Sequence, residues 1–130
     1  MNVGCLLFLA ASSALAAVTI KSEKPDGTPN RAVWMARGGF GVMTHYLITP
    51  KGSTPREKTA DLNRIVDNFN LAHYMKQFDE TGADWLIFTL DQGTGYLSSK
   101  NDFIDKLEPG LTPRRDLITE IGTELRKRNK

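Results

Sequence analysis

The sequence predicts an α/β protein, and more closely the N-terminal βα units of a (β/α)8 TIM barrel that is incomplete in this chain. Two apolar segments with the length of buried strands flank a region of helical periodicity, and another helical pattern follows the second segment. Such alternation favours parallel strands joined by helical crossovers. Two parallel strands alone make an unstable sheet. Since a whole barrel needs about 250 residues, we expect half of one or less; a small self-contained α+β domain or an obligate oligomer is the alternative.

The two expected strands are both bounded by residues that break regular structure. The first covers Phe40–Ile48, after Gly38-Gly39 and before Pro50. The second covers Trp85–Leu90, and five of its six residues are apolar without clean alternation. That composition is typical of a strand covered on both faces, as in parallel sheets.

Three helices are expected, each with its own start signal. Thr54-Pro55-Arg56-Glu57 has the form of a capping box with Pro at the first helical position. Asn70 is suited to cap the second helix and Gly82 to end it. Thr112-Pro113 is expected to open the last helix. Between them, the loop from Asp91 to Leu111 is long, and loops of that length are usually functional or contain further structure.

The N-terminal region predicts export. Val3–Ile20 carries no charge, and Ala14-Leu15-Ala16 fits a small-residue cleavage site. We therefore expect a signal peptide over residues 1–17, a linker over 18–32, the barrel portion over 33–130, and a secreted or periplasmic protein. A signal anchor is the alternative, because the uncharged run reaches the lower limit of a membrane span. Cys5, the single cysteine, lies in the signal, so the mature chain would have no disulfide.

Composition excludes several classes of protein. The chain has 130 residues, 40% hydrophobic and 25% charged, with a net charge of +2. This is globular composition with no strong attraction for nucleic acid. After signal cleavage no membrane association is expected. The two histidines, His45 and His73, do not have metal-ligand spacing, so neither a metal nor a cofactor is expected.

Candidate binding residues follow both strands. Ligands of α/β folds bind at the carboxyl ends of the strands, and parallel strands bring those ends to one side. This selects five residues: His45, Tyr46, Asp91, Gln92 and Tyr96. They offer an imidazole, acceptors, an amide and aromatic rings. A core histidine and a plain turn are the structural alternatives. Gly93-Thr94-Gly95 is not a dinucleotide fingerprint, because Ser98 replaces the third glycine.

Several short motifs, in order, resemble the α-L-fucosidase family of glycoside hydrolases. The matching segments are Trp34, Gly39–Met43 with His45-Tyr46, Phe69-Asn70, Gly82-Ala83, Phe88-Thr89 to Gly95-Tyr96, Ser99-Lys100 and Arg115-Asp116-Leu117. The resemblance covers residues 34 to 128. It implies a (β/α)8 barrel, a carbohydrate substrate and retaining hydrolysis by two carboxyl groups. It also implies that His45 contacts the sugar.

The sequence departs from the family near the ends of both expected strands. Gln92-Gly93 stand where the family usually has a His-His pair, and Tyr46 stands where Trp is usual. The family's nucleophile and acid/base lie on later strands, so no catalytic residue is expected in this chain. The leading interpretation is the N-terminal part of a secreted glycoside hydrolase that is inactive alone. A non-catalytic carbohydrate-binding relative and a small secreted interaction domain are the alternatives.

Overall fold

The structure is a computed structural model that describes residues 21–130. The chain divides into two compact units between Val33 and Trp34. The signal peptide predicted for residues 1–17, together with Cys5, lies outside the described residues, as do residues 18–20 of the predicted linker.

Residues 21–33, the described part of the first unit, contain a closed turn. An antiparallel bridge joins Glu23 and Pro29, and the Lys24 N–H donates to the Thr28 carbonyl at 2.8 Å. Gly27 has a φ of 80°, the left-handed conformation that such a turn requires. The side chains are mostly exposed. The segment predicted as a linker therefore has local hydrogen-bonded structure.

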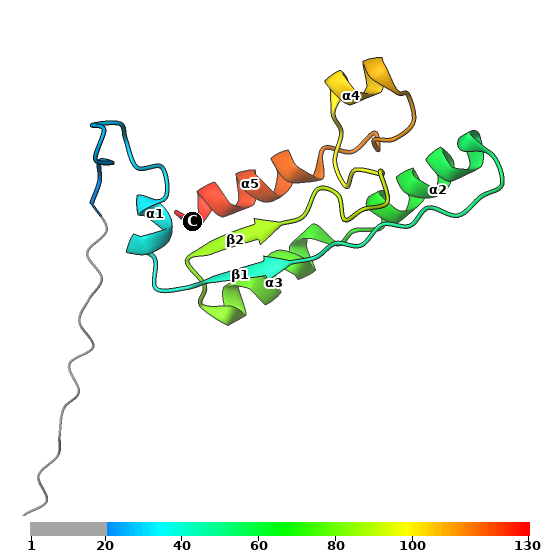
Figure 1. Cartoon of the computed structure of the whole chain (residues 1–130). Helices are drawn as coiled ribbons and strands as arrows, with labels where there is room; N and C mark the ends of the chain where they lie inside the picture. Colours follow the sequence, from blue (N-terminus) through cyan, green and yellow to red (C-terminus); the bar gives the residue numbers. More distant parts are fainter. Residues whose placement is uncertain (1–20) are drawn as a thin grey trace, which may run out of the picture. The chain divides into compact units, whose positions relative to one another are not determined.

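The second unit is built on one β-α-α-β arrangement. Figure 1 shows the element order, which is α1 (Val33–Arg37), β1 (Gly41–Thr44), α2 (Pro55–Asp67), α3 (Leu71–Thr81), β2 (Trp85–Phe88), α4 (Asp102–Leu107) and α5 (Leu117–Lys127). The two strands are parallel, as the alternation of strands and helices predicts, with Gly41 opposite Trp85 and Thr44 opposite Phe88. The described residues form a two-stranded sheet and no third strand, so the predicted barrel stays a prediction.

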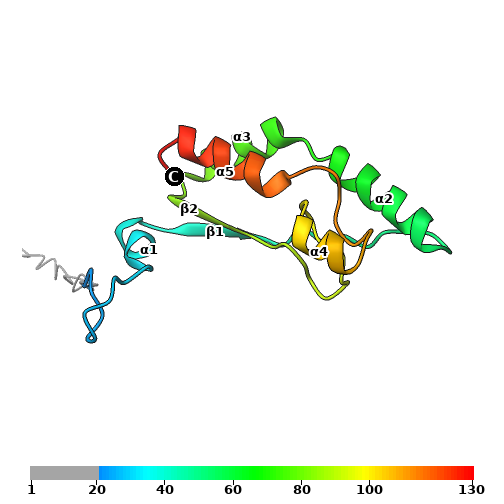
Figure 2. The same cartoon turned by 90° about the horizontal axis from the view of Figure 1, so that it is seen from above.

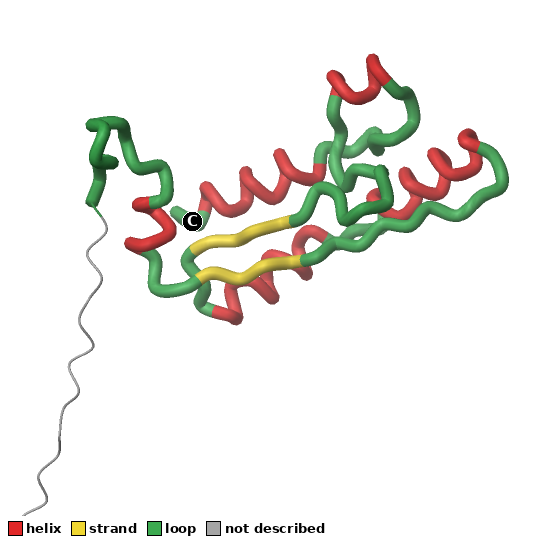
Figure 3. Tube along the Cα trace, viewed as in Figure 1, coloured by secondary structure: helices red, strands yellow, loops and turns green. Residues whose placement is uncertain are grey.

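Both strands are shorter than predicted. The first was expected over Phe40–Ile48 and the second over Trp85–Leu90, but regular pairing ends at Thr44 and Phe88. Beyond these residues a side chain takes the place of a backbone acceptor: the Tyr46 N–H donates to the Thr89 hydroxyl at 3.0 Å. Past Thr44 and Phe88 both segments continue in the direction of the strands (Figure 3), which keeps the two strand ends adjacent.

The starts of α2 and α3 confirm the predicted caps. Thr54 and Glu57 form the complete capping box, with the Glu57 N–H donating to the Thr54 hydroxyl at 3.3 Å. Asn70 accepts from the His73 N–H at 3.0 Å, and Gly82 ends α3 with a φ of 70°. These contacts satisfy backbone groups that a helix end leaves unpaired.

The last helix begins later than predicted. Thr112 and Pro113 are buried in the connection, and α5 starts at Leu117 with Asp116 as its N-cap. The Thr112 hydroxyl accepts from the Asn101 N–H at 3.4 Å instead of capping a helix. The long loop contains the short helix α4, which accounts for part of its unusual length.

The helices α3 and α5 cover one face of the sheet, while Trp34 of α1 packs against Trp85 at the amino end of the other face. In Figures 1 and 2, α3 and α5 lie on the same side of β1 and β2. The core fills this side and comprises Ile48, Leu62, Val66, Met75, Phe78, Ala83, Leu117 and Ile121. On the opposite face Met43 and Ile87 are register partners, and they are 53% and 39% exposed. Among residues 21–130, no helix is long and apolar enough to cross a bilayer.

Candidate functional site

The two strand ends lie together because pairing continues past the regular sheet. The Thr89 N–H donates to the Thr44 carbonyl at 3.1 Å, and the Thr89 hydroxyl accepts from the Tyr46 N–H. These two bonds hold the segment after β1 beside the segment after β2. The loops that carry His45 and Gln92 therefore leave the sheet from adjacent positions.

His45 and Gln92 are in direct contact. The distance from His45 Nδ1 to Gln92 Oε1 is 2.6 Å, between residues 47 positions apart in the sequence. Because a carbonyl oxygen only accepts, a hydrogen bond between these two atoms requires the imidazole proton on Nδ1. Both side chains are exposed, and within the described chain neither His45 Nε2 nor the Gln92 amide nitrogen has a hydrogen-bond partner.

Tyr46 lies apart from the contact between His45 and Gln92, and its predicted role in substrate binding stays a prediction. Its ring contacts Phe69 and Phe88 at centroid distances of 5.2 and 5.6 Å, and its hydroxyl donates to the Ile65 carbonyl at 3.3 Å. Burial raises the pKa of the Tyr46 phenol, with the Arg115 charge acting in the opposite direction. Tyr46 therefore packs in the core between the sheet and the helices.

Asp91 shapes the loop that carries Gln92. Its Oδ1 accepts from the Thr94 N–H, three residues further on, at 3.2 Å. Gly93 and Gly95 have φ values of 80° and 77°, which other residues adopt only at a cost. One oxygen of Asp91 is thus used within the turn, and the side chain stays exposed.

Tyr96 lies at a different cavity. It is half-buried, packs against the core and lines a cavity of about 220 Å³ together with Ser53, Thr54 and Glu108. Neither His45 nor Gln92 lines that cavity. Of the five predicted site residues, the structure therefore brings His45 and Gln92 into contact and leaves Tyr96 apart from them.

Two buried serines anchor the loop after β2. The Ser98 hydroxyl donates to the Thr89 carbonyl at 3.0 Å, which closes the base of the loop. The Ser99 hydroxyl donates to Asp116 at 2.8 Å and accepts from the Ile118 N–H at 3.0 Å. Both serines are at most 2% exposed. They are structural residues that fix the loop, and so Gln92, against β2 and the start of α5.

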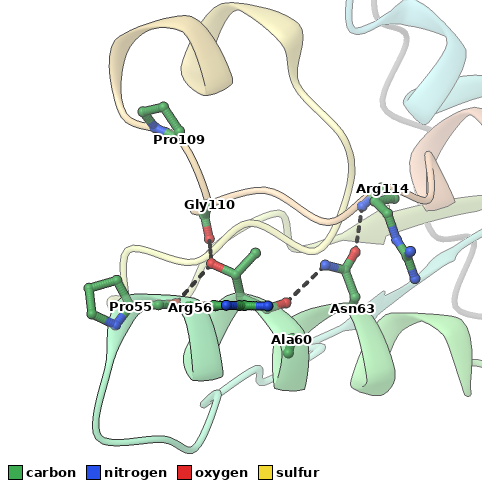
Figure 4. A pocket seen from close by; sticks show the side chains of 8 residues that line it. Pro55, Arg56, Ala60, Asn63, Pro109, Gly110 and Arg114 are labelled. Carbon is green, nitrogen blue, oxygen red and sulfur yellow. Dashed lines mark hydrogen bonds between the residues drawn. The ribbon is translucent and has the colours of Figure 1, made fainter.

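A larger cavity lies elsewhere, between α2 and the segment before α5. It has a volume of about 670 Å³, and Figure 4 shows its wall of Pro55, Arg56, Ala60, Asn63, Pro109, Gly110 and Arg114. No pattern in the sequence links these residues, because they come from segments about 50 positions apart. Most of its polar groups are already paired: Asn63 accepts from the Arg114 N–H at 2.8 Å and donates to the Thr59 carbonyl at 2.9 Å. This cavity therefore lies where hydrogen bonds join helix α2 to the loop before α5.

Within residues 21–130, no group of three His, Cys, Asp or Glu side chains is placed to hold a metal ion. Comparison with known proteins gives no family: no protein-family model matches the chain, no curated protein matches it, and no solved structure matches it. The contact between His45 and Gln92 and the motifs in the sequence are therefore the features that bear on function.

Proposed function

We propose that this chain is the N-terminal part of a carbohydrate-active (β/α)8 domain in a secreted glycoside hydrolase related to α-L-fucosidases. In this proposal His45 and Gln92 form part of the sugar-binding surface. The observation that carries it is their hydrogen bond at the carboxyl ends of two parallel strands. That is where ligands bind in barrels and in open α/β sheets.

The one-sided sheet supports the barrel. Parallel sheets occur with both faces covered, yet here the face opposite α3 and α5 exposes Met43 and Ile87. In a (β/α)8 barrel this face would pack in the interior against other strands. The side chain of His45 follows Met43 by two positions, so strand alternation directs it to the same face. Further strands would turn this surface into the wall of a closed cavity.

Hydrolysis with retention needs two carboxyl groups about 5 to 5.5 Å apart. At the described strand ends Asp91 is the one carboxylate among the predicted site residues, and it accepts a hydrogen bond in its own turn. Both catalytic carboxylates would therefore come from later strands. We assign no catalytic residue in this chain, and we expect the chain alone to be inactive.

Sequencing the reading frame downstream of Lys130 tests the proposed enzyme. We expect further strand–helix units, with carboxylates at the ends of two later strands. Later strands without such carboxylates would favour the non-catalytic carbohydrate-binding relative. A stop codon directly after Lys130, in a chain that folds cooperatively alone, would contradict both and favour a small interaction domain.

Binding measurements on the longer protein test the site itself. Fucose and a panel of other neutral monosaccharides would be titrated against the parent protein and the variants His45→Ala and Gln92→Ala. We expect both variants to weaken binding while the fold is unchanged by circular dichroism. His73→Ala is the matched control, because His73 is an exposed residue of α3. Equal affinity in all four proteins would overturn the assignment of the site.

A further inference from the structure

The hydrogen bond between Gln92 and His45 bears on which imidazole nitrogen carries the proton. A neutral imidazole carries its proton on one of two nitrogens, and the partner of one nitrogen decides the role of the other. Here Gln92 Oε1 lies 2.6 Å from Nδ1. Within the described residues, Nε2 has no competing donor or acceptor.

We propose that Gln92 is a positioning residue that holds His45 in the Nδ1–H tautomer. Nε2 is then an obligatory acceptor, and the Gln92 amide nitrogen, which has no partner within the described residues, is a donor on the neighbouring side chain. This pair of groups suits adjacent hydroxyls of a neutral sugar, since a hydroxyl both donates and accepts. The ligand class rests on the proposed function; the tautomer does not.

The surrounding structure gives Gln92 a fixed place from which to act. Its loop begins at β2, turns through Gly93 and Gly95, and is tied back by the Ser98 hydroxyl on the Thr89 carbonyl. An amide at this position orients the imidazole without adding a charge. A histidine at position 92 would offer one ring N–H or one ring nitrogen acceptor. Gln92 instead offers an amide donor and a carbonyl acceptor to a ligand.

The chain holds two histidines, which makes the tautomer directly measurable. The protein would be labelled with ¹⁵N-histidine and examined by NMR well above the pH range in which imidazoles titrate. We expect His45 to give a protonated, pyrrole-type Nδ1 signal and an unprotonated, pyridine-type Nε2 signal. His73, on the surface of α3, is the internal reference for an imidazole at an exposed helix position.

Two variants separate positioning from structure. In Gln92→Ala we expect His45 to shift toward the Nε2–H tautomer with the backbone spectrum otherwise retained. In Gln92→Glu the acceptor oxygen remains, so the Nδ1–H tautomer should persist. A His45 already in the Nε2–H form, or one that Gln92→Ala leaves unchanged, would overturn the positioning role.

Sugar binding tests the ligand class with the same variants. Gln92→Glu keeps the tautomer but lacks the amide donor, so we expect its affinity for a neutral monosaccharide to fall roughly tenfold, about one hydrogen bond. Unchanged affinity would overturn the donor role of Gln92. If the tautomer behaves as expected but no neutral monosaccharide binds the parent, the proposed function fails while the positioning role of Gln92 is supported.

Discussion

The indole of Trp85 lies directly over Gly41, its register partner on the adjacent strand. A Cβ added at residue 41 would overlap the six-membered ring of this indole. Trp34 completes the arrangement by meeting Trp85 edge-on, with ring centroids 6.2 Å apart. A glycine is therefore required at position 41, because the Trp85 ring approaches the backbone closely at the amino end of the sheet.

Replacing Gly41 by alanine should destabilise the protein. The added methyl group must displace the Trp85 ring, and overpacking of this kind costs about 1–3 kcal/mol. Urea denaturation would measure the change in the free energy of unfolding. Gly39→Ala is the control, because a Cβ there would approach Asp84 Oδ2 at an ordinary 3.4 Å. Equal stability of the two variants would show that the indole does not occupy this position.

Arg115 should contribute more to stability than its neighbour Arg114. Its Nη1 donates to the Val66 and Phe69 carbonyls, both at 2.9 Å, and its guanidinium pairs with Glu120. Arg115→Met would leave those carbonyls without their charged donor, a loss of about 2–3 kcal/mol. Arg114 is 78% exposed in its ion pair with Asp67, so Arg114→Met should change stability by less than about 0.5 kcal/mol. Similar losses in thermal denaturation would contradict this assignment.

Asp116 should make stability depend on pH in the acid range. Hydrogen bonds from the Thr119 hydroxyl and N–H, and then from Ser99, lower the pKa of its carboxyl below the ordinary 3.8. The folded state therefore binds fewer protons than the unfolded state, and this contribution is present above about pH 4 and lost as pH falls through the folded pKa. Asp116→Asn retains a capping side chain without the titration. We expect the stability difference between parent and variant to shrink on acidification; a constant difference would be contrary to expectation.

If the proposed barrel is correct, the face that exposes Met43 should behave differently in this chain and in the complete barrel. If further strands cover it, Met43→Gln buries an unpaired amide in the longer protein, at a cost of about 1–3 kcal/mol. In the chain alone, where Met43 is 53% exposed, the change should be close to neutral. Leu107→Gln, on α4 and 68% exposed, is the control in both backgrounds. A neutral Met43→Gln in the longer protein would argue against the barrel.

The sequence predicted those features that depend on neighbouring residues. The caps at Thr54, Asn70 and Gly82 follow from local hydrogen bonds and backbone conformation, so short motifs are sufficient to find them. The contact between His45 and Gln92 could be anticipated because parallel strands bring their carboxyl ends together. The remaining features of the fold depend on packing between distant segments, which local sequence patterns do not determine.

The start of α5 differs from the predicted one, and the packing of Tyr46 was not anticipated. Tyr46 continues the alternation of Val42 and Thr44 toward the helices, a signal that could have placed it in the core. Thr112-Pro113 has the same form as Thr54-Pro55, yet packing buries it and Asp116 supplies the cap. The cavity beside Arg114 joins segments far apart in sequence, so no motif could indicate it.

The most direct measurement is a titration of the protein with neutral monosaccharides, followed residue by residue through its backbone amide NMR signals. We expect the signals of residues 44–45 and 91–93 to shift together, with one dissociation constant, and Gln92→Ala to weaken the response. Shifts confined to the cavity between α2 and Pro109–Arg114, or no shift at either strand end with any sugar, would contradict this expectation.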